Sequence, residues 1–285
     1  MKMSNIPQLL DCKTYRLDLN KKTLVMGVLN VTPDSFSDGG LYTHVEKAVA
    51  HAKQMADDGA DIIDIGGEST RPGYTPVPAD DEQSRVLPVI RKVANEVKAP
   101  ISIDTYKAET ARRALEAGAS IINDVWGAKA DPDMANVAAE YDVPIILMHN
   151  RHDTNYRDVM ADMIKDLRES IDIVRRAGVK KNKIILDPGI GFAKTYEQNL
   201  EVMDRLEELT ALDYPVLLGT SRKSIVAKTL GLPKNERVEG TGATVCLGIE
   251  KGCRIVRVHD VLPIKRMTTM MDAMLKRRAV AVPQY

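Results

Sequence analysis

The chain has 285 residues, enough to bury well over half of the surface that its unfolded chain exposes. It therefore needs no disulfide or metal for stability. Its 40 basic and 40 acidic residues cancel, which argues against nucleic acid and anionic membranes as partners because both bind basic surfaces. No segment approaches the roughly 20 apolar residues of a membrane span, and the amino-terminal residues lack the apolar core of a signal peptide, so we expect a cytoplasmic protein.

Three cysteines are present, at Cys12, Cys246 and Cys253. Their odd count and the lack of a C-x-x-C spacing argue against both a disulfide framework and a zinc site. We interpret Cys246 and Cys253 as buried apolar residues and not as nucleophiles.

The first predicted element is a β-hairpin within residues 1–22. Tyr15, Leu17 and Leu19 alternate with polar residues, which is typical of a strand with one buried face. Residues 20–22 (Asn-Lys-Lys) could turn the chain. This hairpin precedes a series of buried strands, and we expect it to close the floor of the barrel that those strands form.

Eight short runs rich in Ile and Val follow the hairpin and predict eight β-strands. Each run is almost continuously apolar, as expected for parallel strands that are covered on both faces. The predicted strands lie at 23–30, 61–65, 100–104, 120–124, 143–149, 183–187, 214–219 and 254–259.

Helical patterns separate the predicted strands, for example at 44–58 and 158–177. A glycine stands just before several strands, in DDGADIIDIG, EAGASIINDV and EKGCRIVRVHD, where it is expected to end the preceding helix in a left-handed conformation. These segments form an internal quasi-repeat. A β-α unit built eight times predicts an α/β fold, a single (β/α)8 TIM barrel at 23–278 followed by a tail at 279–285.

Nearly every predicted strand ends in a polar side chain, and in a (β/α)8 barrel these carboxyl ends form the active-site face. One such residue could simply begin a solvated loop, but a full ring indicates a binding site. The ring contains Asn30, Asp64, Asp104, Asn123, Asp124, His149, Asp187, residues 220–223, Arg257 and His259.

Asp104, Asn123 and Asp187 offer acceptors for a small flat heterocycle rich in N–H donors. A 2-amino-4-oxo pyrimidine edge presents two parallel donors, as a guanidinium does, and a buried carboxylate needs a partner of this kind. Each residue alone has a structural alternative: Asp104 could pair with a lysine of the barrel, and Asn123 could cap the following loop.

Lys223, Arg257 and His259 come from the last two strands, an arc that frequently binds phosphate in this fold. Three donors there favour a phosphorylated or pyrophosphorylated substrate over a neutral one. The glycines of DPGIGFAKT (187–195) allow the backbone to approach a ligand closely, although G-I-G alone is a weak indication.

Segments 30–40 and 66–73 follow the first two strands and are rich in Gly and Pro. Loops of this length at the mouth of a barrel are usually functional. Their composition suggests that they move or become ordered on binding, so we expect both to take part in holding the substrates.

Seven motifs resemble, in this order, those of bacterial dihydropteroate synthases: MGVLNVTPDSFSDGG, DIIDIGGESTRPG, SIDTYKA, IINDVWG, LDPGIGF, GTSRKS and RVHD. The resemblance covers nearly the whole chain, and its first two motifs are long and specific. It implies a (β/α)8 barrel and a homodimer formed through the late helices. The implied activity is that of a transferase of folate biosynthesis, a target of sulfonamides, which condenses 6-hydroxymethyl-7,8-dihydropterin pyrophosphate with p-aminobenzoate to give 7,8-dihydropteroate and pyrophosphate.

The resemblance also assigns the substrate-binding residues. The positions that hydrogen-bond the pterin in the family are matched by Asp104, Asn123, Asp187 and Lys223. Apolar residues that line the pterin and aminobenzoate sites are matched by Met148 and Phe192. The positions that hold p-aminobenzoate are matched by Thr70, Arg71, Pro72 and Ser224, and Phe36 lies in the first mobile loop.

For the pyrophosphate, Arg257 and His259 match the family's diphosphate-binding pair, with Arg71 beside them, and Asn30 matches a ligand of Mg2+. These groups would neutralise the charge that develops on the leaving group. The family is thought to react by an SN1-like path, in which Asp38 would stabilise a pterin cation. Catalytic roles are therefore expected for Asp38, Lys223, Arg257 and His259.

Three alternatives remain open. A methyltetrahydrofolate-binding methyltransferase domain would share the pterin-binding residues, but it has no use for a pyrophosphate-binding pair or for the two long loops. A metal-dependent hydrolase usually has a His-x-His motif on the first strand, where this chain has Leu29, Asn30 and Val31. A non-catalytic pterin-binding protein would not need three donors for an anion, and magnesium-dependent release of pyrophosphate would separate it from an enzyme.

Four methionines near the carboxyl end recur at helical spacing: Met267, Met270, Met271 and Met274. They could pack against the barrel. They could instead form a dimer face, because methionine suits adaptable apolar surfaces.

Overall fold

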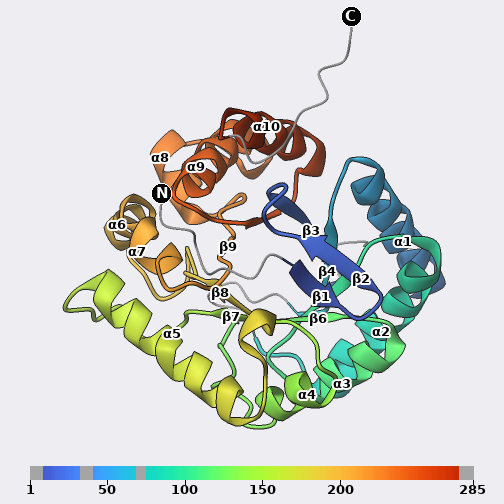
Figure 1. The fold of residues 1–285 in the computed structure, drawn as a ribbon. Coiled ribbons are helices and arrows are strands. Elements are labelled where there is room, and N and C mark those ends of the chain that lie inside the picture. Colours follow the sequence, from blue (N-terminus) through green and yellow to red (C-terminus); the bar gives the residue numbers. More distant parts are fainter. Residues whose placement is uncertain (1–8, 33–40, 69–74, 276–285) are drawn as a thin grey trace, which may run out of the picture.

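The computed structural model describes residues 9–32, 41–68 and 75–275, and of residues 41–43 only the backbone. Figure 1 looks along the axis of a barrel in which a central ring of strands is surrounded by helices. The predicted (β/α)8 barrel is confirmed. Within the described segments, no helix is long and apolar enough to cross a membrane.

Eight parallel strands form the barrel wall, in the order β8-β7-β6-β5-β4-β3-β10-β9. Each strand is buried almost throughout because the barrel interior covers one face and the helices cover the other. The strands are β3 (Leu24–Asn30), β4 (Ile62–Gly66), β5 (Ile101–Asp104), β6 (Ile121–Asp124), β7 (Ile145–Met148), β8 (Ile184–Asp187), β9 (Leu217–Leu218) and β10 (Ile255–Val258).

The two edge strands of this order meet, so that the wall is nearly continuous. Leu186 and Val216 form an isolated parallel bridge, and the Leu186 N–H donates to the carbonyl of Pro215 at 2.9 Å. All eight predicted strands exist, but β9 is much shorter than the predicted 214–219. Pro215 has no N–H to donate to a ladder, which limits regular pairing at the start of this segment.

The helices of the described segments follow the strands and cover the outside of the barrel (Figure 1). Three of them end where the sequence predicted, since Gly59, Gly118 and Gly252 take positive φ values of 97°, 122° and 106°. The helices are α1 (Leu41–Asp57), α2 (Ala79–Glu96), α3 (Ala108–Ala117), α4 (Met134–Glu140), α5 (Val159–Arg176), α6 (Tyr196–Asp204), α7 (Leu206–Thr210), α8 (Ser224–Leu230), α9 (Val238–Glu250) and α10 (Val261–Met274).

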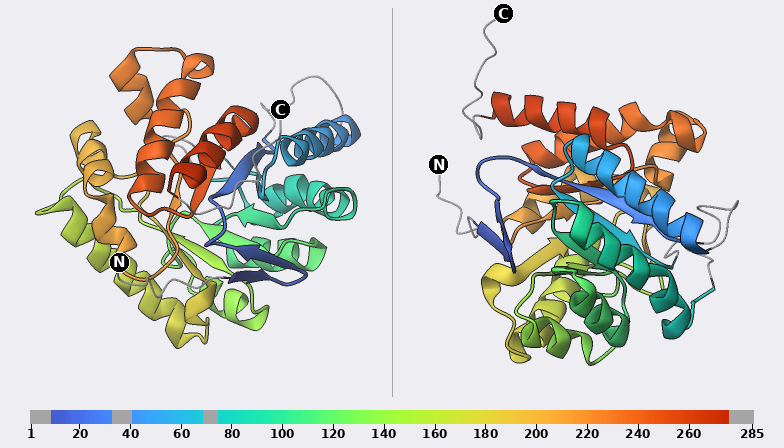
Figure 2. Two further views of the ribbon diagram at one scale, coloured as in Figure 1. Left: turned by 45° about the horizontal axis from the view of Figure 1, so that its top comes forward. Right: turned by 90° about the vertical axis from the view of Figure 1, so that its right-hand side faces the viewer.

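The predicted amino-terminal hairpin is present and lies across one end of the barrel, as the side view in Figure 2 shows. It consists of β1 (Leu9–Cys12) and β2 (Tyr15–Asp18), paired antiparallel. Leu10 and Cys12 are fully buried in an apolar cluster with inward-facing residues at the amino ends of the barrel strands. The hairpin therefore closes the floor and leaves the carboxyl ends of the strands for the site.

The turn of the hairpin differs from the expectation. Lys13 and Thr14 form it, with Lys13 at a φ of 58°, whereas residues 19–22 turn the chain from β2 into β3. The Lys13 ammonium donates to the carbonyls of Leu115 and Ala119, both at 3.0 Å. These contacts with the barrel hold a turn that has no glycine or asparagine to favour it.

The two ends of the barrel sequence are joined by hydrogen bonds. The Thr23 N–H and Oγ1 donate to the two carboxylate oxygens of Asp272, each at 2.7 Å, and both residues are buried. Thr23 precedes β3 and Asp272 belongs to α10, so this contact fixes the last helix against the first barrel strand.

The four methionines of α10 divide between two environments. Met267 and Met271 pack against the core, whereas Met270 and Met274 are 59% and 56% exposed. Within the described residues, only two of the four methionines therefore pack against the barrel. The exposed pair lies on the outer surface of the barrel.

Candidate active site

The strand register brings the predicted pterin residues to one level of the barrel. Asp104 at the end of β5 pairs with Asn123 of β6, and Met148 at the end of β7 pairs with Asp187 of β8. All four side chains are buried. Because these strands are parallel, their carboxyl ends face the same side, opposite the hairpin.

The guanidinium of Arg257 lies among carboxylates at the centre of this site. Its Nε donates to Asp64 Oδ2 and its Nη2 donates to Asp104 Oδ2, both at 2.6 Å. Asn123 Nδ2 donates to the same Asp64 oxygen at 3.2 Å. Asp104 therefore pairs with an arginine and not with a lysine, and Asn123 does not cap the following loop.

Two carboxylate oxygens of this cluster are buried and receive no hydrogen bond from any described residue: Asp64 Oδ1 and Asp104 Oδ1. A buried acceptor without a donor costs roughly 1–3 kcal/mol. Such acceptors in the barrel centre suit a ligand that carries N–H groups.

Burial dominates the electrostatics of the cluster. It raises the pKa of Asp104 to about 7, against the opposing effect of Arg257 and with the added repulsion of Asp64. Burial alone would lower the pKa of Arg257, but Asp64 and Asp104 outweigh it and the pKa is raised. Arg257 therefore stays charged at neutral pH, whereas Asp104 binds a proton more readily than an exposed aspartate does.

Asp187 and Lys223 form the second half of the site. Asp187 Oδ1 accepts from the Gly189 N–H at 2.7 Å, and burial raises the pKa of Asp187 while Lys223 opposes this. Burial lowers the pKa of Lys223 to about 8, opposed by Asp187. The Lys223 ammonium donates to the Ile190 carbonyl at 2.6 Å and lies 4.7 Å from the centre of the Phe192 ring.

His259 is held by a residue that the sequence analysis did not single out. The hydroxyl of Ser221 lies 3.0 Å from His259 Nδ1 and accepts from the His259 N–H at 3.2 Å. Ser221 is buried, and its hydroxyl holds the His259 imidazole through this contact.

Asn30 and Ser224 lie at the rim. Asn30 ends β3 and is half-buried, and Ser224 begins α8 and is exposed. In the described residues no group of three or more His, Cys, Asp or Glu side chains could hold a metal. A closed metal cage is therefore not built from these residues, whereas the amide oxygen of Asn30 fits one position around a Mg2+ that is otherwise bound by phosphate oxygens and water.

Five of the predicted site residues lie outside the described residues. They are Phe36, Asp38, Thr70, Arg71 and Pro72. Their assignments, like the division of the tail at 279, stay predictions.

Asp64 is a central residue of this polar cluster to which the sequence pattern assigned no role. It was part of the polar ring but was not assigned a role, although it accepts from both Arg257 and Asn123. The signal was present, because Asp64 stands at the end of a buried strand, as Asp104 does.

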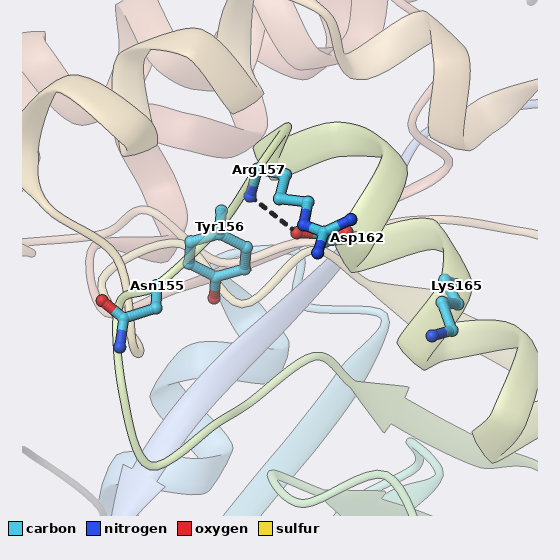
Figure 3. A pocket seen from close by; sticks show the side chains of 5 residues that line it. All are labelled: Asn155, Tyr156, Arg157, Asp162 and Lys165. Carbon is cyan, nitrogen blue, oxygen red and sulfur yellow. Dashed lines mark hydrogen bonds between the residues drawn. The ribbon is translucent and has the colours of Figure 1, made fainter.

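A separate pocket lies where β7 connects to α5 (Figure 3). It is lined by Asn155, Tyr156, Arg157, Asp162 and Lys165. The Arg157 N–H donates to Asp162 at 2.9 Å, which closes one side. None of the predicted substrate residues lines this pocket, and we take the buried polar cluster as the candidate active site.

Fold and site together define a (β/α)8-barrel enzyme with acceptors and cations at the carboxyl ends of its strands. The family described as pterin binding enzyme matches residues 26–259. A dihydropteroate synthase of Bacillus subtilis (strain 168) is 62% identical over 273 residues, 96% of each chain. One of Clostridium beijerinckii is 56% identical over 261 residues, which cover 91% of this chain and 97% of that one.

Solved structures agree with these relatives. The dihydropteroate synthase of Clostridium difficile, crystallised in the presence of pteroic acid, has a TM-score of 0.89 and 52% identity, over 90% of this chain and 98% of that one. The enzyme of Xanthomonas albilineans in complex with 7,8-dihydropteroate has a TM-score of 0.87 and 39% identity, over 96% and 100% of the two chains. The chain belongs to the dihydropteroate synthase family of pterin-binding enzymes.

Proposed function

We propose that this chain condenses 6-hydroxymethyl-7,8-dihydropterin pyrophosphate with p-aminobenzoate. The bond between the pterin CH2 carbon and the pyrophosphate oxygen breaks. A bond from that carbon to the amine nitrogen forms, and the nitrogen then loses a proton to solvent. The products are 7,8-dihydropteroate and pyrophosphate.

The observation that carries the proposal is the pair of buried acceptors in the barrel centre, Asp64 Oδ1 and Asp104 Oδ1. The amino and ring N–H groups of a pterin supply donors in one plane, which suits such acceptors. We assign pterin recognition to Asp104, Asn123, Asp187 and Lys223, with Met148 and Phe192 as apolar walls.

Arg257 and His259 are proposed to receive the pyrophosphate, with Asn30 and Arg71. Arg257 holds two carboxylates in the described structure through Nε and Nη2, and a guanidinium has five N–H donors, so donors remain that could bind an anion. Mg2+ bound at Asn30 would supply positive charge against the leaving group. Arg257 and His259 supply the same kind of stabilisation from the protein itself.

The path is proposed to be SN1-like, with pyrophosphate leaving before the amine attacks. The amine of p-aminobenzoate is already nucleophilic, so the chain needs no covalent nucleophile. Asp38 is proposed to stabilise the pterin cation, and Thr70, Arg71, Pro72 and Ser224 to hold p-aminobenzoate.

A homodimer through α9 and α10 is proposed for the assembly. The exposed Met270 and Met274 support it, since they leave apolar surface on the last helix. We propose the cytoplasm as the compartment, which agrees with three cysteines that form no disulfide in the described part of the chain.

The test is pyrophosphate release by the purified protein with the pterin pyrophosphate, p-aminobenzoate and Mg2+, and with each omitted in turn. Release that depends on Mg2+ and gives dihydropteroate only with the amine supports the proposal. Pterin binding without release would reject catalysis and favour a methyltransferase domain or a passive pterin-binding protein.

A further inference from the structure

The loop between β8 and α6 is held from behind by a lysine. The ammonium of Lys194 lies 2.8 Å from His149 Nδ1 and donates to the carbonyls of Gly189 and Phe192, both at 3.2 Å. An ammonium has three donors, and these three acceptors satisfy all of them. Lys194 therefore ties residues 189–192 to the end of β7.

The contact that His149 Nε2 makes with Asp166 determines that the other ring nitrogen, Nδ1, accepts from Lys194. His149 Nε2 lies 3.1 Å from Asp166 Oδ2, and Arg151 Nε donates to the same oxygen at 2.5 Å. Burial lowers the pKa of His149 to about 4, so the ring is neutral at pH 7 and carries one proton. With that proton on Nε2, facing Asp166, Nδ1 is left to accept from Lys194.

The same loop decides where the second half of the site lies. Between the two carbonyls that Lys194 holds, the Ile190 carbonyl accepts from Lys223 at 2.6 Å. The Phe192 ring lies 4.7 Å from the Lys223 ammonium. The Gly189 N–H donates to Asp187. A shift of the loop would move Lys223, Phe192 and Asp187 together.

We propose that Lys194 is a positioning residue of the reaction: its ammonium fixes the 189–192 loop and thereby sets Lys223 and Phe192 for the pterin substrate. This assignment rests on the proposed function. Lys194 acts through the loop and does not touch the substrate.

The positioning depends on the charge of Lys194. Burial lowers its pKa to about 7, with Asp187 opposing and Lys223 and Arg151 adding to the effect. The titratable or charged groups around it come from the segment after β7, from α5, from the end of β8 and from the residue before α8: His149, Arg151, Asp166, Asp187 and Lys223. A neutral amine keeps two donors for three acceptors, so one contact is lost as pH rises through about 7.

The experiment compares Lys194→Met and Lys194→Arg with wild type, measuring KM for the pterin pyrophosphate and kcat from pH 6 to 9. Lys180→Met is the matched control, because Lys180 pairs at the surface with Asp142 and lies before the amino end of β8, whereas the loop follows its carboxyl end. For wild type we expect KM for the pterin to rise across pH 7. Lys194→Met should increase this KM about tenfold at pH 6 and abolish its increase across pH 7.

Lys194→Arg keeps its charge over this range and should move the rise to higher pH, toward the titration of Lys223. A wild-type pH profile of KM in Lys194→Met would overturn the proposal. An increase in KM that stays at pH 7 in Lys194→Arg would also overturn it. The Lys194→Arg result tests the proposal by itself if Lys194→Met does not fold. Absence of dihydropteroate formation by wild type would reject the proposed function instead, and titration of 6-hydroxymethylpterin fluorescence would then test the role of Lys194 in binding.

Discussion

Arg257 Nε donates to Asp64 Oδ2 at 2.6 Å across 193 positions of sequence, and Asp64 is fully buried. The pair links β10 to β4 through the centre of the barrel. It also fixes the direction of the Arg257 side chain in the candidate active site. Removing one member of such a pair leaves the other charge buried without its partner.

Asp64→Asn should therefore raise KM for the pterin pyrophosphate at least tenfold and lower the free energy of unfolding by about 2 kcal/mol. Steady-state kinetics and urea unfolding measure both effects. Asp61→Asn is the control, because Asp61 pairs with Lys265 just before the same strand, at the floor end. It should lower stability but leave KM unchanged, and an equal rise in KM in both variants would contradict the role of Asp64.

Gly189→Ala should be far more destabilising than Gly231→Ala. The two glycines have nearly the same φ, 65° and 66°, so the backbone strain of an alanine is matched at about 1–2 kcal/mol. A Cβ at Gly189 would lie 2.0 Å from the His149 carbonyl oxygen, whereas one at Gly231 would meet no described atom within 4 Å. Thermal unfolding should show a loss of unfolding free energy above roughly 3 kcal/mol for Gly189→Ala only. Equal losses in the two variants would refute the clash with the His149 carbonyl.

His149 should make stability depend on pH in the acid range. Its pKa is lowered from 6.5 to about 4 by burial, so its contribution is complete above pH 6.5 and is lost as pH falls toward 4. His149→Gln keeps a donor toward Asp166 but does not titrate. The difference in unfolding free energy between wild type and His149→Gln should shrink by on the order of 3 kcal/mol between these pH values. A difference independent of pH would show that His149 titrates normally.

Asn30→Ala should weaken the binding of the Mg2+ that the reaction requires. If the amide oxygen is a ligand of Mg2+, the Mg2+ concentration for half-maximal pyrophosphate release should rise about tenfold or more. Binding of 6-hydroxymethylpterin, which has no phosphate, should not change. A normal magnesium titration in this variant would remove Asn30 from the metal site.

Met270→Asp combined with Met274→Asp should dissociate a dimer formed through α10. Both side chains are more than half exposed, and a charge in an apolar interface is costly. Light scattering at micromolar concentration should give a dimer mass for wild type and a monomer mass for the variant. Leu200→Asp on α6 is the control at another exposed apolar residue. A monomeric wild type would exclude the dimer.

The barrel was predictable because its strands are short, apolar and evenly separated by helical patterns. The left-handed glycines before β4, β6 and β10 gave the helix ends. The hairpin turn was missed because Lys13 carries no turn signal and is held by contacts with Leu115 and Ala119, distant in sequence.

The composition of the site followed from the strand ends, but its pairing did not. A long side chain such as Arg257 reaches several partners, and only the fold selects Asp64 and Asp104. Ser221 and Lys194 act by supporting other residues, and periodicity does not reveal such support. Both were visible only after distant loops had been brought together.

The contact between Thr23 and Asp272 constrains how the chain is made. During synthesis, β3 emerges early and keeps an open edge until its neighbour β10 leaves the ribosome. The buried hydroxyl and N–H of Thr23 receive their acceptor later still, with α10. The nascent protein therefore remains an unclosed sheet until β10 and α10 have been made, and these last two elements, more than any earlier unit, close the barrel.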